Sequence, residues 1–394
     1  MTTKTTSWII NNVQIVQEEA ITKGAVIVSD GAIEHIISEA EYSSYANEKD
    51  LPVIDGKGGL LMPGFIDIHV HGGNGGDFMN ANRKSFDAIT SFHAAHGTTA
   101  MLATTMTASK EAIEAVLAAV TEYRSTQMPY TELIGVHLEG PFISEKWPGA
   151  QNPSFIHPPS VEWVKEWNSN WPDQIKQLTM APEKPGAIET IKWLSEQGII
   201  VACGHTDAVY AELKAAADAG LAHAVHTYNA MRGLHHREPG TLGAVLTDDR
   251  IYCEIIADGE HVHPAAINLM LRAKPLDKVI IITDAIEAAG MPDGNYQLGG
   301  LAVTVSNGTA RLTEGNALAG SSLTMNRAIR YLAKNTSLHL NQISRMASGN
   351  PARELRIFDQ TGSIETGKRA DLVWLDNEYN VQQTWVQGRT IFTK

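Results

Sequence analysis

The chain contains only two cysteines in 394 residues, Cys203 and Cys253. They are far apart and each lies in an apolar run, so we expect two buried thiols in a reducing compartment. Since there is no CxxC pair, any bound metal must be held by histidines and carboxylates. No apolar run reaches the roughly 18–20 residues that a membrane span needs, and the start has no signal-peptide core. These absences predict a cytoplasmic protein without a membrane partner.

Basic residues are also scarce, with 31 Lys and Arg against 44 Asp and Glu and a net charge of −13. Nucleic-acid binding requires a basic face, so we expect no nucleic-acid partner. A small phosphorylated ligand is still compatible, because one local arginine or histidine cluster binds it. The length allows one large barrel with an accessory domain, or two to three ordinary domains.

Short strand patterns occupy both ends of the chain. Residues 7–16 and 24–37 carry β-branched side chains around an Asp30-Gly31 turn, and residues 370–375 and 384–392 have the same character. We therefore predict one small β-sandwich domain built from residues 1–60 and 360–394.

The middle of the chain alternates short apolar runs with helical patterns, such as those at residues 110–124, 186–196 and 209–219. This βαβα rhythm predicts an α/β fold, a TIM-like (β/α)₈ barrel over residues 61–359. A doubly wound sheet has the same rhythm and remains an alternative, although no GxGxxG follows an early strand. The apolar runs predicted to be strands are 60–71, 99–105, 133–139, 198–203, 222–226, 252–257 and 279–283.

Polar residues capable of chemistry fall where these predicted strands end. Strand carboxyl ends are where a barrel builds its active site. His₂-carboxylate sets with room for water are typical of catalytic metal sites, and a further carboxylate ligates metal or transfers a proton. One such site explains these positions better than separate structural roles. The polar residues at these predicted strand ends are His69, His71, Glu139, His205, His226 and Asp284.

Longer segments around these residues resemble a known family. PGFIDIHVHG, HLEGPF, GHTDA, HTYNAM, REPG, ADGEHVHP and TDA follow in order, and AGSSLTM and GSIETGKRADLV come after them. Together they resemble the amidohydrolase superfamily and, within it, the N-acetylglucosamine-6-phosphate deacetylases. The resemblance implies a barrel with a terminal β-sandwich. It also implies hydrolysis of the acetamide of N-acetyl-D-glucosamine 6-phosphate to D-glucosamine 6-phosphate and acetate by metal-activated water.

The same resemblance implies roles for the strand-end residues. Glu139, His205 and His226 would hold the principal divalent metal. His69 and His71 would supply a second site, which Glu139 could bridge. One or two ions per subunit are therefore expected, with Zn, Fe, Mn or Co as candidates. Asp284 matches the family's catalytic acid and base.

Substrate contacts are implied in the same way. Asn229 and Ala230 match a loop that contacts phosphate, and Arg237 matches an arginine that binds phosphate, in related proteins from the neighbouring subunit. A homodimer is therefore expected. His261 matches a histidine near the polar groups of the substrate. Gln151 stands where some relatives have histidine, and it cannot carry charge.

Some assignments stay open at this level. His137 shares a strand face with Glu139, which leaves a place in the site or in the core equally open, whereas His223 and Trp147 are interpreted as structural. Met325 is a candidate for the wall of an acetyl pocket. Two alternative functions remain, a metal-dependent amidohydrolase for a different N-acyl or cyclic amide and a non-catalytic barrel scaffold.

Overall fold

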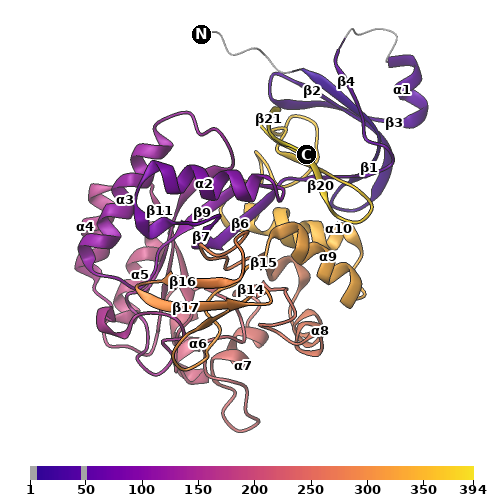
Figure 1. Ribbon diagram of the computed structural model, residues 1–394. Coiled ribbons are helices and arrows are strands. Elements are labelled where there is room, and N and C mark those ends of the chain that lie inside the picture. Colours follow the sequence, from indigo (N-terminus) through magenta and orange to yellow (C-terminus); the bar gives the residue numbers. More distant parts are fainter. Residues whose placement is uncertain (1–6, 46–50) are drawn as a thin grey trace.

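The computed structural model describes residues 7–45 and 51–394. Residues 1–6 and 46–50, which belong to the predicted domain 1–60, lie outside the described residues. Two eight-stranded sheets dominate the fold, one wrapped by helices and one at the end of the molecule that contains strands from both the early and the late part of the chain (Figure 1). None of the helices in the described ranges is long and apolar enough to cross a bilayer.

The larger body is the predicted barrel. Its eight strands pair in parallel in the order β15-β14-β13-β12-β11-β10-β9-β6. The ring is joined at the ends of this order, because the backbone N–H of Asp284 donates to the carbonyl of His69 at 2.9 Å. Thr283 Oγ1 also donates to Asp67 Oδ2 at 2.5 Å. The strands are β6 (Phe65–Val70), β9 (Thr98–Thr104), β10 (Glu132–Glu139), β11 (Ile175–Met180), β12 (Ile200–Cys203), β13 (His223–Ala224), β14 (Tyr252–Ile256) and β15 (Val279–Ile282).

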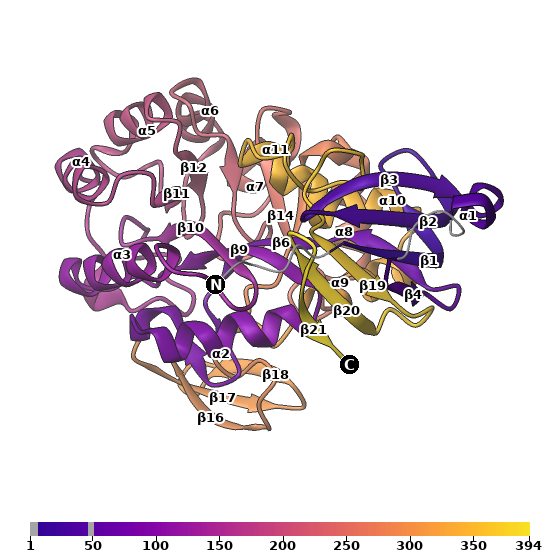
Figure 2. The ribbon, with the colours of Figure 1, turned by 90° about the horizontal axis from the view of Figure 1, so that it is seen from above.

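Helices cover the outside of this ring (Figure 2). Several begin at a side-chain cap, such as Ser109, which accepts the backbone N–H of Ala112. Residues 340–354 form one continuous helical run, and its middle part is a π-helix, η4 (Arg345–Gly349). The α-helices of the barrel are α2 (Arg83–Ala94), α3 (Lys110–Arg124), α4 (Val161–Asn170), α5 (Ala187–Glu196), α6 (Tyr210–Asp218), α7 (Gly240–Thr247), α8 (Pro264–Ala273), α9 (Met325–Asn335), α10 (Leu340–Ser344) and α11 (Asn350–Glu354). Short 3-10 turns are η1 (Phe78–Asn80), η2 (Pro153–Phe155) and η3 (Leu276–Lys278).

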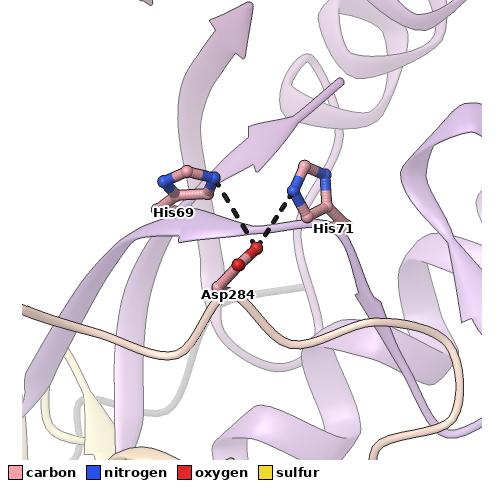
Figure 3. Close-up of side chains that lie close together, drawn as sticks. All are labelled: His69, His71 and Asp284. Carbon is pink, nitrogen blue, oxygen red and sulfur yellow. Dashed lines mark ion pairs between the residues drawn. The ribbon is translucent and has the colours of Figure 1, made fainter. Parts of the chain in front are cut away.

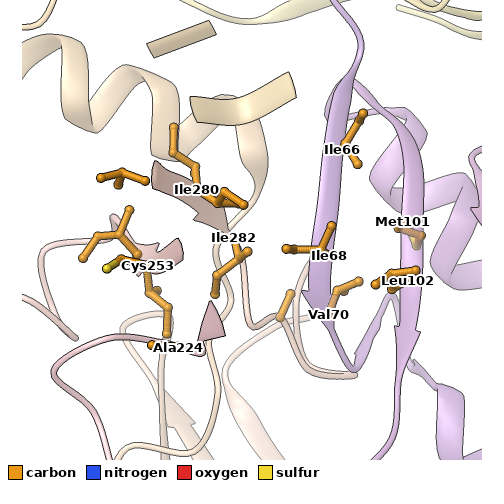
Figure 4. Close-up of a cluster of buried hydrophobic side chains, with 14 of the residues drawn as sticks. Ile66, Ile68, Val70, Met101, Leu102, Ala224, Cys253, Ile280 and Ile282 are labelled. Atoms are coloured by element: carbon orange, nitrogen blue, oxygen red, sulfur yellow. The ribbon is translucent and has the colours of Figure 1, made fainter. Parts of the chain in front are cut away.

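Alternate residues of the barrel strands face two different environments. The apolar set, which includes Ile66, Ile68 and Val70 of β6, is fully buried in the large hydrophobic cluster (Figure 4). The other set contains polar side chains that meet across the ring, as His69 of β6 meets Glu254 of β14. The ring is therefore held together by hydrogen bonds across its interior on one face of the strands and by apolar packing on the other.

Strands from both ends of the chain form the second sheet, as predicted. Its order is β21-β20-β19-β5-β1-β2-β3, with β4 paired to β1. Trp8 of β1 stacks on Trp385 of β20 with ring centroids 4.7 Å apart. Since two strands separate β1 from β20 in this order, the sheet folds over a core, which gives the predicted sandwich. The elements are β1 (Trp8–Val16), β2 (Ile21–Ser29), β3 (Ala32–Ser38), α1 (Glu39–Tyr45), β4 (Val53–Asp55), β5 (Leu60–Pro63), β19 (Leu372–Leu375), β20 (Val381–Val386) and β21 (Arg389–Thr393).

The predicted boundary at residue 60 stays a prediction, and β5 crosses it. Two further features were absent from the sequence prediction. One is barrel strand β11. The other is a three-stranded antiparallel sheet inserted between β15 and α9, made of β16 (Gly294–Leu298), β17 (Leu301–Ser306) and β18 (Thr309–Leu312). A small hairpin, β7 (Gly72–Gly73) with β8 (Gly76–Asp77), follows β6.

Candidate active site

Glu139 lies at the centre of the polar cluster at the carboxyl ends of the barrel strands. Its Oε1 lies 3.0 Å from His226 Nε2, 3.2 Å from His205 Nε2 and 3.3 Å from His69 Nε2. Its Oε2 lies 3.3 Å from His71 Nε2. The structure thus brings together all five residues that the resemblance assigned to metal binding.

Asp284 completes the cluster from the end of β15. Figure 3 shows His69, His71 and Asp284 converging, with Asp284 Oδ1 at 3.2 Å from His71 Nε2 and 3.7 Å from His69 Nε2. His69 and His71 project to the same side because side chains two residues apart on a strand share a face. Ligand atoms of His69, His71 and Asp284, and likewise of His69, Glu139 and His226, lie close enough for one ion to be held by each group.

The backbone is unusual where these side chains leave the strands. His205, His226 and Asp284 have φ angles of 48°, 29° and 51°. Residues other than glycine rarely adopt positive φ, and each instance costs of order 1–3 kcal/mol unless the surroundings enforce it. The fold holds these three residues in that conformation where their side chains meet.

The donors and acceptors of the cluster fit a cation. Nδ1 of His69, His71 and His205 faces an oxygen that only accepts, namely Glu254 Oε2 at 2.7 Å and the carbonyls of Thr104 at 3.3 Å and Trp147 at 2.9 Å. Each Nδ1 therefore carries the hydrogen, and in the neutral ring the Nε2 lone pair points at the carboxylate of Glu139. Lone pairs facing one another at these distances repel, so positive charge is required between them, either as protons on the imidazoles or as a metal cation. A divalent ion suits this donor set.

Electrostatics lead to the same conclusion. Burial disfavours charge on His71, yet hydrogen bonds to Asp284 and Glu139 outweigh it and raise the pKa of His71 to about 9. Burial opposes the charge of Glu139 as well, but the charge of His69 and hydrogen bonds from His205 and His226 hold its pKa well below its ordinary value. The cluster thus stabilises positive charge at its centre.

A cavity of about 490 Å³ opens above the cluster. Its lining includes His71, Glu139, His205, His226 and Asp284 on the floor. Four of the residues predicted to contact substrate also line it: Gln151, Asn229, Ala230 and His261.

Gln151 connects the cavity wall to the cluster. It accepts the backbone N–H of Thr107 at 2.7 Å and donates to Glu139 Oε2 at 2.5 Å. His261 is fixed by Asp258 through an Nδ1 contact of 2.7 Å. Both side chains are thus held in place by protein partners on one side while they face the cavity on the other.

Three other residues considered at the sequence level lie elsewhere. Arg237 is exposed on the loop before α7, with Nη1 2.9 Å from His236 Nε2. Met325 is fully buried at the start of α9. His137 lies beneath the cavity, with Nε2 2.7 Å from Thr179 Oγ1. None of the three is among the described residues that line the cavity, and the substrate roles of Arg237 and Met325 stay predictions.

Sequence reasoning missed several residues. Trp147 and Lys146 line the cavity, as does Arg311 from the inserted strand β18. Glu254 and His223 form a hydrogen-bonded pair behind His69. The signal for Glu254 was present, because a single acidic residue interrupts the apolar strand YCEII and a buried carboxylate needs strong partners.

Residues 60–391 match the model of the Amidohydrolase family, and the chain belongs to that family. Among its relatives, the N-acetylglucosamine-6-phosphate deacetylase of Bacillus subtilis (strain 168) is 41% identical over 390 residues, covering 98% of this chain and 97% of that protein. The N-acetylgalactosamine-6-phosphate deacetylase of Escherichia coli O157:H7 is 39% identical over 330 residues, covering 84% and 87%.

Two solved structures are similar to this chain over almost its full length. The N-acetylglucosamine-6-phosphate deacetylase of Thermotoga maritima has a TM-score of 0.87 at 34% identity, with 98% of this chain and 100% of that chain covered. A mutant of the Mycobacterium smegmatis enzyme, in complex with N-acetyl-D-glucosamine-6-phosphate, has a TM-score of 0.91 at 29% identity, with the same coverage.

Proposed function

We propose that this chain hydrolyses the acetamide of N-acetyl-D-glucosamine 6-phosphate to D-glucosamine 6-phosphate and acetate. The observation that carries the proposal is the position of Asp284. Its carboxylate lies against a cluster of imidazoles and Glu139 that fits a divalent cation, on the floor of a cavity large enough for a small sugar. The relatives named above act on phosphorylated N-acetyl amino sugars, which supports the substrate.

Glu139, His205 and His226 would hold the principal ion, and His69 and His71 a second one. An ion bound there lowers the pKa of a coordinated water and polarises the acetamide carbonyl. The identity and number of the ions belong to this proposal, with Zn, Fe, Mn and Co as the candidates.

Asp284 performs the proton transfers. Its pKa is lowered, because the hydrogen bond with His71 and the positive charge of the cluster outweigh burial, and a cation held there would lower it in the same direction. As a carboxylate it accepts a proton from the attacking water and passes that proton to the sugar nitrogen, which leaves as the amine. Gln151, which donates to Glu139, presents an uncharged amide and takes no part in proton transfer.

The phosphate would lie at the wall of the cavity away from Asp284. Asn229 and Ala230 are in the loop after β13, and both line the cavity. Binding energy from the phosphate orients the acetamide at the floor. Arg237 would reach a phosphate from a second subunit of a homodimer, since it is exposed in the single chain. We also propose a cytoplasmic location, in line with two free, buried cysteines.

Acetate release by metal-quantified protein tests the substrate. We expect rapid, chelator-sensitive turnover of N-acetylglucosamine 6-phosphate and slow turnover of unphosphorylated N-acetylglucosamine. N-acetylgalactosamine 6-phosphate is a necessary third substrate, because one relative is named for it. A faster reaction with the galactosamine epimer would transfer the proposal to that sugar. Turnover of N-acyl amino acids alone would favour the other amidohydrolase function.

The role of Asp284 gives the first prediction. Asp284→Asn keeps the shape of the side chain but cannot accept a proton, so we expect kcat to fall about 10²–10⁴-fold. Metal content, measured by mass spectrometry, should match that of the wild type if Glu139 and the histidines hold the ion. Near-normal kcat in this variant would remove Asp284 from the reaction, and metal-free inactive wild type would revive the scaffold alternative.

A further inference from the structure

A row of four buried ionisable side chains runs from His69 away from the cavity. His69 Nδ1 lies 2.7 Å from Glu254 Oε2, Glu254 Oε1 lies 2.9 Å from His223 Nε2, and His223 Nδ1 lies 2.8 Å from Glu354 Oε1. The first three side chains have no exposed surface, and that of Glu354 is 5% exposed. Burying charged groups is costly even when they are paired. The reaction proposed above gives His223, Glu254 and Glu354 no role.

The two carboxylate oxygens of Glu254 have different partners. Oε2 faces the candidate active site, where it accepts from His69 Nδ1 and from the backbone N–H of His226 at 3.0 Å. Oε1 faces away, toward His223 Nε2 and toward Gln177 Nε2 at 3.4 Å. One oxygen therefore contacts two members of the cluster, while the other is anchored by the barrel interior.

These contacts fix both the hydrogen and the orientation of the His69 ring. With Nδ1–H directed at Glu254, the Nε2 lone pair is directed at Glu139 and Asp284. Within the described residues, His69 Nε2 is buried and has no hydrogen-bond partner. Rotation of the ring would break the 2.7 Å contact. A buried nitrogen held in this way, close to two carboxylates but without a hydrogen bond, suits a metal ligand.

The same oxygen also acts on His226. The backbone N–H that it accepts belongs to a residue at a φ of 29°, where a side chain other than glycine is strained. Glu254 thus joins the ring of His69 to the backbone of His226, and these two residues come from β6 and from the end of β13.

We propose that Glu254, anchored by His223, is a positioning residue of the metal centre that holds the Nε2 of His69 and the backbone of His226 in ligating geometry. This inference rests on the metal centre of the proposed function. Carboxylates hydrogen-bonded to metal-ligating histidines orient the ring and raise its basicity, and their loss weakens metal affinity.

Cobalt binding tests the proposal, because the visible absorption of Co²⁺ reports ligand geometry independently of catalysis. Glu254→Met matches the length of the side chain but accepts no hydrogen bond. We expect it to weaken Co²⁺ affinity about 10- to 100-fold and to alter the Co²⁺ spectrum. Glu254→Gln keeps one accepting oxygen, so its loss of affinity should be smaller than that of Glu254→Met.

A variant of the same strand controls for general destabilisation. Ile255→Val lies next to Glu254 on β14, is fully buried and points to the opposite face. It should lower stability toward urea while Co²⁺ affinity and spectrum stay unchanged. If Glu254→Met lowers stability but leaves Co²⁺ affinity and spectrum as in the wild type, Glu254 is only structural and the proposal is overturned.

A double-variant cycle with His69→Asn carries the test if Glu254→Met does not fold. Since Glu254 acts in part through His69, the loss of Co²⁺ affinity in the variant with both Glu254→Gln and His69→Asn should be smaller than the sum of the two single losses. Fully additive losses would overturn the proposal. Wild-type protein that binds no Co²⁺ would overturn both this inference and the metal centre. Co²⁺ binding without acetate release would overturn only the proposed substrate, and the ranking of variants would still decide the role of Glu254.

Discussion

At the scale of single residues, the polar groups fall into those at strand ends and those within strands. His226 ends a predicted strand and His205 and Asp284 come just after one, and their place was predictable because the carboxyl ends of barrel strands lie at one face. Glu254 lies in the middle of β14 and His223 begins β13, and an isolated polar residue at such a position gives no indication of its partner. Their hydrogen-bond partners come from other strands. The sequence near a residue does not indicate which side chain it will meet across the barrel interior.

His93 of α2 offers a prediction at this scale, away from the cluster. Its Nε2 lies 3.0 Å from the carbonyl of Gly72, and burial lowers its pKa to about 4 despite that hydrogen bond. The unfolded chain, with a pKa near 6.5, takes up a proton at higher pH than the folded protein does. This contribution to stability is therefore complete above about pH 6.5 and is lost as pH falls toward 4.

We expect the free energy of unfolding of the wild type to fall by about 2 kcal/mol more than that of His93→Gln between pH 7 and pH 5. Urea titrations of both proteins at equal metal loading measure the difference. Glutamine does not titrate but can still donate to the carbonyl of Gly72. The same loss in both proteins would show that His93 is not the source of the acid sensitivity.

At the scale of elements, apolar runs predicted seven barrel strands but not β11. Its sequence, IKQLTM, carries Lys176 and Gln177, and Gln177 faces the polar barrel interior through its contact with Glu254. A strand with polar residues that face this interior has no continuous apolar run in its sequence, and such a run is the feature by which a buried strand is predicted. The inserted sheet β16–β18 was missed for another reason, because it interrupts the βα rhythm after β15 and packs on its own small cluster.

That insertion supplies Arg311, which we predict to bind the phosphate of the substrate. Arg311 is half-buried in the cavity wall, donates to the carbonyl of Asn316 at 3.0 Å and has no ion-pair partner in residues 7–45 and 51–394. Arg311→Gln should raise KM for the phosphorylated sugar about tenfold or more, the cost of losing one charged hydrogen bond. KM for the unphosphorylated sugar should change little.

Lys146→Gln is the matched control, since Lys146 lines the same cavity but already pairs with Asp207 at 2.9 Å. Steady-state kinetics with both sugars should show a smaller rise in KM for this variant. Arg237→Gln, measured in parallel, tests whether the exposed loop shares the phosphate. Equal effects of Arg311→Gln on phosphorylated and unphosphorylated sugars would contradict a phosphate contact.

At the scale of the whole molecule, the sequence predicted both the barrel and the sandwich built from the two chain ends. Both features were predictable because they follow from the order of the patterns along the chain, which has strand patterns at both ends and alternating strand and helix patterns between them. The cluster also depends on the whole barrel, because its candidate metal ligands come from β6, β10 and the ends of β12 and β13. A cation there would connect distant parts of the ring.

Chelation should therefore destabilise the whole barrel. A ligand at a hundredfold excess over its Kd stabilises the folded state by about 2.7 kcal/mol, and we expect Tm in calorimetry to fall on chelation and to recover on addition of Zn²⁺. Glu139→Gln removes the carboxylate that all four histidines face, so its Tm should respond far less to the chelator. A wild-type Tm that ignores the chelator would contradict a metal held between these strands.

The terminal sheet, in which Trp8 stacks on Trp385, is completed only when the last strands of the chain have been synthesised. The sheet places β19 beside β5, so residues made first pair with residues made last. While the ribosome is still adding the final strands, β5 has an open edge that could pair with other chains. A premature stop codon shortly before residue 372 would leave that edge open permanently, and its product should aggregate even though every residue of the metal cluster would be present.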